Sequence, residues 1–394
     1  MTATAFVGFT GFTVVMPFLP LYIEQLGVTR AGDIALWSGV TLGVTPALAA
    51  LCAPLWGRVG DRFGNKILVQ RSLVAAIIVM TAMAYATRAW HLFALRAVMG
   101  LFAGWGPLTI AMAALAAPPA RVAQAIGTIQ TAQRLGPTIG PIIGGALAPL
   151  VGLRNAFLVS ALFYVVALVG VTAWYHEGPR PPKKDTAAER ASFATILAFE
   201  NLILLMVVIF GLQLVDRSFS PILAIYLGQI GYEAESIPLM AGVLFSVLAL
   251  SAAGGNQLTA RLLERHSPRT VMTRAALIAA CALAAFGLTP SAWGLGVELA
   301  VIGTCLGICM TTAFATGAAV LPREVHSTAF GFLTGSSLVA LAVSPVLSGL
   351  IGARSIRIVF VGGVVVLVAL AVVVRKVMVE RTPADGPRPS PGES

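Results

Sequence analysis

Five ionisable side chains stand inside long apolar stretches of this 394-residue chain, namely Arg96, Arg134, Asp216, Arg217 and Glu298. A charge at membrane depth costs about 2.5 to 3.5 kcal/mol on insertion scales, so each of them is a candidate functional group. Asp216 lies near the middle of its stretch, where desolvation and a nearby arginine act on a carboxyl in opposite directions. We expect Asp216 to gain and lose a proton; a static ion pair with Arg134 or Arg96 is the alternative.

The other reactive residue types point to no further chemistry. Glu298 is kept as a proton-coupling candidate, although it lies close to one end of its stretch and is more simply explained by snorkelling to water. The four histidines stand singly near the ends of stretches, so no metal site and no cofactor are expected. The cysteines all fall inside apolar stretches and are expected to be reduced small hydrophobic residues: Cys52, Cys281, Cys305 and Cys309.

The composition places these charges in a membrane. Hydrophobic residues make up 58% of the chain and charged residues 11%, against about 25% charged in a soluble domain. The apolar stretches are helices rather than barrel strands, because "LVAAIIVMTAMAYA" shows no alternation of period two. We expect an all-α membrane protein with twelve spans, at 3–26, 35–57, 66–87, 90–116, 123–149, 153–175, 202–228, 236–260, 270–290, 293–318, 326–350 and 355–379.

The net charge of +10 is explained by where the basic residues fall. Most lysines and arginines outside the spans lie in the loops after even-numbered spans, in the linker and in the tail. The opposite loops carry few, namely Arg30, Arg88, Arg154, Arg354 and Arg357. By the positive-inside rule both termini are cytoplasmic, and a bacterial inner membrane is expected. No nucleic-acid partner is needed, and no signal-peptide cleavage site is apparent.

The second half of the sequence repeats the first. A shift of about 204 residues pairs Pro17 with Pro221, Tyr22 with Tyr226, Gly27 with Gly231, Pro141 with Pro345 and Gly145 with Gly349. A shift of 203 pairs Gly100 and Gly104 with Gly303 and Gly307. We expect two parallel six-helix bundles, at 1–175 and 202–379, joined by a cytoplasmic linker at 176–201 and followed by a disordered tail at 380–394.

The stretch "GRVGDRFGNK" forms a polar loop between two spans. The chain has to turn sharply there, which we expect Gly57, Gly60 and Gly64 to allow. Asp61 can face the positive end of a neighbouring helix or pair with an arginine, and so latch the two halves together. A loop that only anchors the chain is the alternative.

Three motifs resemble those of the major facilitator superfamily. The first is Gly57, Asp61, Arg62, Gly64 and Lys66, which resembles its gating motif A. Arg96 with Gly100 resembles motif B, whose arginine is implicated in proton transfer. "GPTIGPIIGG" matches the antiporter motif C and supplies Gly136, Gly140, Pro141, Gly144 and Gly145. Over essentially its full length, the chain resembles the twelve-span drug/proton antiporters of that superfamily.

The motif C residues also have a physical interpretation. Gly136, Gly140 and Gly144 form one bare stripe on a helix, where a partner helix can approach closely. Pro141 removes a hydrogen bond beside that stripe and is expected to bend the helix. We expect this helix to act as a sliding seam; simple tight packing is the alternative.

The resemblance implies a central cavity and a function. Spans one, four, seven and ten line the cavity in such proteins, which here implies Asp216 together with Phe12, Met16, Trp105, Arg134 and Gln213. The leading hypothesis is a monomeric secondary transporter, not an enzyme, that exports small amphipathic compounds in exchange for protons by alternating access. The alternative is a uniporter or symporter of one metabolite or sugar. The sequence contains no nucleotide-binding G-x-x-x-x-G-K-[ST] loop.

Overall fold

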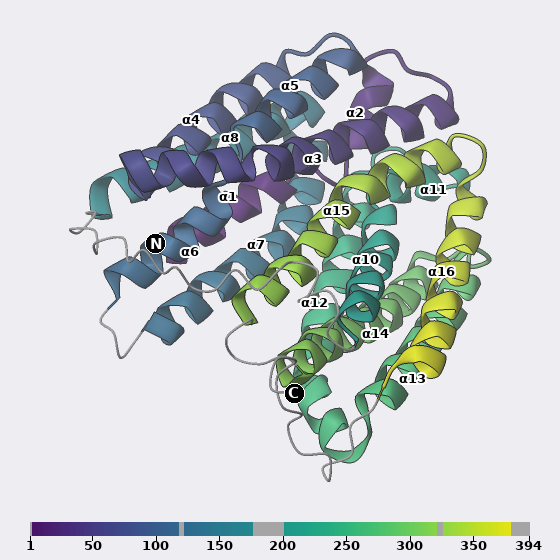
Figure 1. Ribbon diagram of the computed structural model, residues 1–394. Helices are drawn as coiled ribbons and strands as arrows, with labels where there is room; N and C mark the ends of the chain where they lie inside the picture. The colour runs from purple at the N-terminus through teal and green to yellow at the C-terminus, as the bar shows by residue number, and fades with distance from the viewer. Residues whose placement is uncertain (1, 118–121, 176–200, 321–325, 380–394) are drawn as a thin grey trace.

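The computed structural model describes residues 2–117, 122–175, 201–320 and 326–379, and every regular element in these ranges is a helix (Figure 1). The first half contains α1 (Thr2–Thr13), α2 (Leu19–Gln25), α3 (Ala31–Phe63), α4 (Asn65–Ala84), α5 (Ala89–Leu101), α6 (Trp105–Ala116), α7 (Val122–Val151) and α8 (Leu153–Trp174). The second half contains α10 (Leu202–Ser218), α11 (Leu223–Gln229), α12 (Ile237–Arg265), α13 (Pro268–Phe286), α14 (Ala292–Val320), α15 (His326–Gly352) and α16 (Ile356–Val377).

These helices correspond one by one to the twelve expected spans once three broken helices are counted as single spans. Eight helices in the described ranges are long and apolar enough to cross a membrane, and α10 with α11, bent by 46°, makes a ninth. The other three spans are α1 with α2, α5 with α6, and α7. The all-helical membrane fold is confirmed, and the count of twelve is consistent with it.

Proline and glycine account for the breaks. Pro17 precedes α2 and Pro221 precedes α11, and each lacks the backbone N–H that would continue the preceding helix. Between α5 and α6, Gly104 has φ 131°, a backbone conformation that side-chain-bearing residues rarely adopt. The break in the first span and the break in the seventh therefore occur at equivalent positions of the two halves.

Side-chain contacts confirm that the halves are built alike. The Tyr22 hydroxyl donates a 2.8 Å hydrogen bond to the carbonyl of Met83, and the Tyr226 hydroxyl donates one of 3.1 Å to the carbonyl of Phe286. Each bond joins the end of a broken helix to the end of the third span of its half. Because the donors are 204 residues apart and the acceptors 203, the sequence repeat is a structural repeat.

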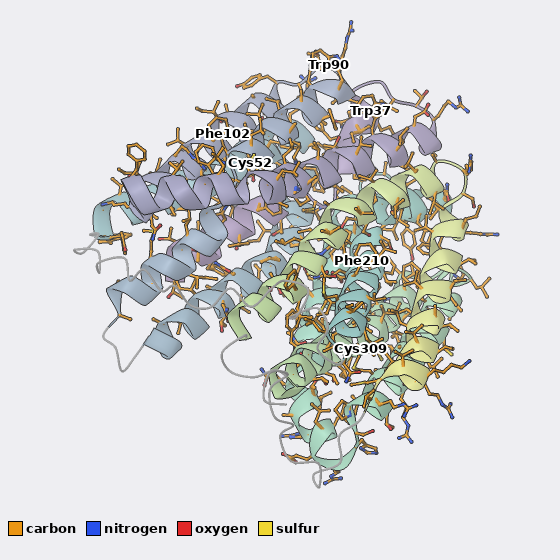
Figure 2. The ribbon with its side chains drawn as sticks, viewed as in Figure 1. Trp37, Cys52, Trp90, Phe102, Phe210 and Cys309 are labelled. Atoms are coloured by element: carbon orange, nitrogen blue, oxygen red, sulfur yellow. The ribbon has the colours of Figure 1, made fainter. Side chains whose placement is uncertain are left out.

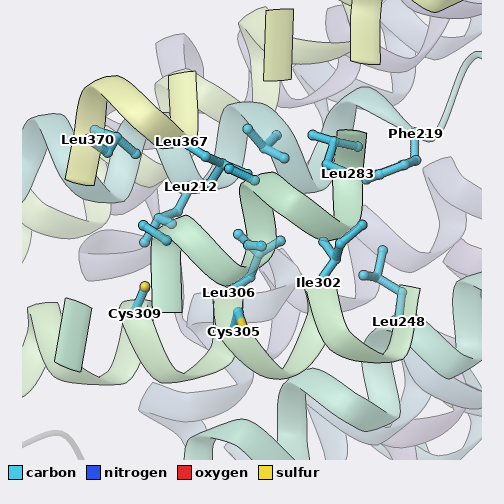
Figure 3. Close-up of a cluster of buried hydrophobic side chains, with 14 of the residues drawn as sticks. Leu212, Phe219, Leu248, Leu283, Ile302, Cys305, Leu306, Cys309, Leu367 and Leu370 are labelled. Carbon is cyan, nitrogen blue, oxygen red and sulfur yellow. The ribbon is translucent and has the colours of Figure 1, made fainter. Parts of the chain in front are cut away.

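Each half has its own buried core. The buried members of one large cluster come from residues 15–175, and those of the other from 202–378. Figure 3 shows the second core, where Leu212, Leu283, Ile302, Leu306 and Leu367 from different helices meet. The bundles are thus two separately packed bodies. The linker at 176–201, apart from Asn201, and the tail at 380–394 lie outside the described residues, so their assignment stays a prediction.

One expectation about the polar loop is wrong. Helix α3 continues without interruption to Phe63, so Gly57 and Gly60 lie inside it and do not turn the chain. Gly64 alone makes the turn, with φ 103°, directly before α4. A change from apolar to polar residues marks the edge of the bilayer, but it does not by itself end a helix.

Candidate functional site

The two bundles meet along two equivalent seams. Helix α7 packs on α12, and α3 packs on α15. A Cβ added to Gly242 would clash with the Pro141 carbonyl on α7, and one added to Gly39 would clash with the Pro345 carbonyl on α15. Gly39 and Gly242 are 203 residues apart, so the two seams are related by the internal repeat. Only glycine permits backbones to approach this closely.

These close contacts lie toward one end of the molecule. On α3 they involve residues near its start, such as Gly32 and Gly39, while Leu51 and Leu55 further along are 76% and 54% exposed. Figure 1 shows the bundles converging beside α2 and α11 and diverging toward the side where α1 begins and α16 ends. The structure is therefore closed at one end of the seams and open at the other.

The glycine stripe of motif C faces its own bundle. A Cβ at Gly136 or Gly140 would lie 2.8 Å from the backbone of Thr10 on α1, and one at Gly144 would clash with Val14, directly after that helix. The contact with the other bundle runs along the neighbouring face of α7, through Pro141 and Gly145. The expected sliding seam thus has two faces, one within the bundle and one between bundles.

Serines replace two of these glycines in the second half. The Ser344 hydroxyl donates a 2.5 Å hydrogen bond to the Leu214 carbonyl, and the Ser348 hydroxyl donates one of 2.6 Å to the Ser218 carbonyl. These serines stand 204 residues after Gly140 and Gly144. The α10–α15 contact is therefore tied by serine hydrogen bonds at positions where glycines give the α1–α7 contact its close packing.

A cavity of about 420 Å³ lies between the bundles. Helices α1 and α7 of the first bundle and α10 and α12 of the second form its walls. Its lining residues are Phe9, Thr13, Met16, Gln133, Pro137, Thr138, Pro141, Asp216, Arg217, Ser220, Phe245, Leu248, Ala249, Ala252, Ala253 and Asn256. The wall combines apolar side chains with nearly as many polar or charged ones, which suits a small amphipathic ligand.

Asp216 and Arg217 provide charge in this cavity. Their side chains form an ion pair of 3.1 Å between Asp216 Oδ2 and Arg217 Nε, and remain 29% and 42% exposed. Among the described side chains, the partner of Asp216 is thus its neighbour in the chain rather than Arg96; the side chain of Arg134 lies outside the described residues. Because the pair is partly exposed in a ligand-sized cavity, a proton or a ligand can reach the carboxylate.

Arg96 occupies a different environment. It is 1% exposed inside the first bundle, with its guanidinium 5.7 Å from the Phe12 ring. Its Nε and Nη2 atoms have no hydrogen-bond partner among the described residues, and neither does the hydroxyl of the buried Tyr164. A buried cation that forms no ion pair with a described residue is energetically expensive, so Arg96 stays a candidate functional residue.

The remaining sequence candidates are dispersed. Glu298 on α14 accepts a 2.6 Å hydrogen bond from the Thr289 hydroxyl, away from the cavity lining. Trp105 packs on Phe9 with ring centroids 4.5 Å apart, and Gln213 donates to Ser337 on α15. Of the expected cavity residues, Met16 and Asp216 line this cavity, whereas Phe12, Trp105 and Gln213 are not among its lining residues. The side chain of Arg134 lies outside the described residues.

Two cavity residues with carboxamide side chains escaped the sequence analysis. Gln133 donates to the Gly106 carbonyl at 3.0 Å and to the Thr109 hydroxyl at 3.1 Å. Asn256, with its amide nitrogen turned toward α14, donates to the Gly307 carbonyl at 2.9 Å. A carboxamide inside an apolar span was the available signal, since it too needs partners away from water.

The motif A residues are only partly visible. The side chains of Gly57, Asp61 and Arg62 lie outside the described residues, so the latch stays a prediction. Lys66 donates hydrogen bonds to the carbonyls of Tyr175 (2.5 Å) and Thr172 (3.2 Å), which ties α4 to the end of α8 within one bundle.

Two equivalent helical bundles around a shared cavity, closed at one end and open at the other, define a membrane transporter rather than an enzyme. Comparison with known proteins agrees. Residues 1–337 match the family model of the Major Facilitator Superfamily. The chain belongs to the Major Facilitator Superfamily, as a multi-pass membrane transporter.

Several relatives and solved structures illustrate the match. The chain is 32% identical to the multidrug resistance protein MdtG of Serratia proteamaculans over 75% of this chain and 72% of that protein. It is 28% identical to the multi-drug resistance efflux pump PmrA homolog of Lactococcus lactis over 91% of this chain and 88% of that protein. Its fold resembles that of a bacterial homolog of the human lysosomal transporter Spinster in an inward-facing, unoccupied conformation, with a TM-score of 0.80 and 17% sequence identity. The match covers 95% of this chain and 94% of that protein.

Proposed function

We propose that this protein is a proton-coupled exporter of small amphipathic compounds, including drugs, that works by alternating access. The observation that carries the proposal is the cavity between the bundles, with the Asp216–Arg217 ion pair in its wall. The names of the relatives, a multidrug resistance protein and a multi-drug resistance efflux pump, support export of drugs rather than uptake of one nutrient.

The charge distribution supports an orientation. The open side carries Lys66 in the first turn of α4, Arg261 and Arg265 in the last turns of α12, and Arg269 in the first turn of α13. By the positive-inside rule this side is cytoplasmic, with both termini. The conformation described here is then open to the cytoplasm and ready to receive a substrate from inside the cell, in a bacterial inner membrane and as a monomer.

Asp216 is the proposed proton carrier. When its carboxylate is charged, it holds Arg217 at 3.1 Å. Protonation removes that attraction and changes the charge of the cavity wall by one unit, so proton and substrate bind to different charge states of the same site. Arg96 and Glu298 remain secondary candidates, because neither lines this cavity.

The test is drug efflux into everted membrane vesicles, with and without a proton gradient. The native chain is expected to accumulate a lipophilic dye only when the gradient is present. Asp216→Asn keeps the shape of the side chain but is expected to abolish the response to the gradient. Asp33→Asn is the matched control, because Asp33 is exposed and its ion-pair partner among the described residues is the exposed Arg30, at 3.9 Å.

Two results would contradict the proposal. If transport by the native chain does not depend on the proton gradient, proton antiport is excluded and a uniporter is favoured. Gradient-driven uptake of a sugar or metabolite favours a symporter. Full coupling in Asp216→Asn moves the proton site to another acid, and Glu298→Gln then tests the next candidate.

A further inference from the structure

A groove of about 200 Å³ opens on the second bundle, apart from the central cavity. The end of α12, the first turns of α13 and the middle of α14 form its walls, and none of its lining residues lines the central cavity. Val271, Ala275, Cys305 and Ile308 lie deep in it and are at most 8% exposed. Ile278 at its rim is 52% exposed, so the groove opens outward on the face that the bilayer covers.

One cation stands at this groove. Arg274 lies on α13, six residues after the helix begins at Pro268, which is about 9 Å along the helix axis. Its side chain is exposed, and it forms no hydrogen bond or ion pair with any described residue. His266 also lines the groove. An arginine at this depth places its guanidinium near the level of lipid headgroups.

The equivalent arginine in the first bundle has partners. Arg71 stands 203 residues before Arg274, at the same place on α4. Its guanidinium stacks 3.3 Å from the centre of the Trp56 ring and donates a 2.9 Å hydrogen bond to the Phe102 carbonyl. The rings of Trp56 and Phe102 are 6.3 Å apart, so Arg71 is held among aromatic side chains (Phe102 is labelled in Figure 2).

The same shift of 203 residues explains why the second bundle has a groove here. Thr259 stands where the first bundle has Trp56, and Cys305 stands where it has Phe102. Thr259 bonds to its own helix, donating to the Gly255 carbonyl at 3.0 Å, and Cys305 belongs to the core shown in Figure 3. Both replacements are smaller than the rings, and Cys305 lines the groove, so Arg274 has no ring at these positions to stack on.

The surrounding charge is positive. Arg261, Arg265 and Arg269 stand on the loop side of the groove, with Glu264 as the acid among them. A groove with apolar walls suits an acyl chain, and a basic rim suits a phosphate. A zwitterionic lipid also carries a phosphate, but its own cation offsets that charge, so the basic rim favours an anionic lipid.

We infer that this groove is a binding site for an anionic phospholipid. One acyl chain lies between α12, α13 and α14, and the lipid phosphate accepts hydrogen bonds from Arg274, with His266 beside it. The lipid takes the place that Trp56 and Phe102 occupy around Arg71 in the first bundle. It joins the end of α12 to the start of α13, on the side of the second bundle that the proposed orientation places in the cytoplasm.

The test is native mass spectrometry of the full chain, released from micelles that hold equal amounts of dioleoylphosphatidylglycerol and dioleoylphosphatidylcholine. The native protein is expected to retain the phosphatidylglycerol preferentially. Arg274→Gln, at an exposed position, is expected to reduce that preference about fivefold, which is the contribution of one basic side chain near an anionic surface. Arg261→Gln removes a charge from the same region without touching the groove and is expected to change it little.

A second variant separates the contribution of the acyl chain to binding from that of the headgroup. Cys305→Phe introduces the ring that the first bundle has at this position and fills the groove, so lipid retention is expected to fall although every arginine remains. Soluble glycerol phosphate is expected not to displace the lipid. The inference is overturned if Arg274→Gln leaves the preference intact, if Arg261→Gln reduces it equally, or if glycerol phosphate competes, since the last result indicates a site for free phosphate.

Discussion

Gly349 offers a direct test of the seam between the bundles. It lies near the end of α15, where an added Cβ would stand 2.5 Å from the Ala35 carbonyl oxygen and 3.0 Å from the Cα of Gly39, both on α3. Ordinary van der Waals contact begins at 3.4 Å, so the Cβ of Gly349→Ala would lie about 0.9 Å too close to the carbonyl oxygen. Backbone atoms on both sides have to move, because no flexible side chain is available to yield.

The expected cost falls on one conformation only. Overpacking of this kind costs about 1 to 3 kcal/mol. The clash exists only in the conformation in which α3 and α15 are in contact at this end of the seam. A penalty of that size shifts a two-state equilibrium by roughly 5-fold to 150-fold. Gly349→Ala is therefore expected to populate a state in which α3 and α15 separate at this end, without unfolding either bundle.

The assay is a distance measurement between spin labels on either side of the seam. Thr29→Cys and Arg354→Cys place labels on exposed loop positions in a chain whose four native cysteines are replaced by alanine. Gly349→Ala is expected to add a population at longer distance. The control is Gly335→Ala on the same helix, where a Cβ would meet nothing within 4 Å. Identical distance distributions for the two variants would refute the argument.

Three further substitutions test the local structure, each by the melting temperature of the purified protein. Gly104→Ala forces a side chain onto a backbone with φ 131° and is expected to destabilise by about 1 to 3 kcal/mol; an unchanged melting temperature would contradict the break between α5 and α6. Ser344→Ala leaves the Leu214 carbonyl without its donor and is expected to cost about 1 kcal/mol, and a neutral result would mean that this bond is not formed. Tyr226→Phe removes the donor to the Phe286 carbonyl and is expected to cost a similar amount, about 1 kcal/mol; greater stability would argue against that bond.

The sequence determined the architecture in outline, for a clear physical reason. A bilayer requires apolar helices of about twenty residues, so each expected span corresponds to a helix or a broken pair of helices. The repeat was readable because proline and glycine mark breaks and close contacts, as Pro17 and Pro221 do beside α2 and α11. Asp216 could be selected from sequence alone because a carboxylate inside an apolar span needs an explanation.

Only the tertiary structure decided which faces of the helices meet. Lipid and protein interior are both apolar, so a span that is apolar on every side does not indicate which of its residues line a cavity. For that reason α7 and α12, rather than the expected fourth and tenth spans, join α1 and α10 around the cavity. For the same reason the different environments of Arg71 and Arg274 appear only once Trp56 and Phe102 are seen to pack around the former.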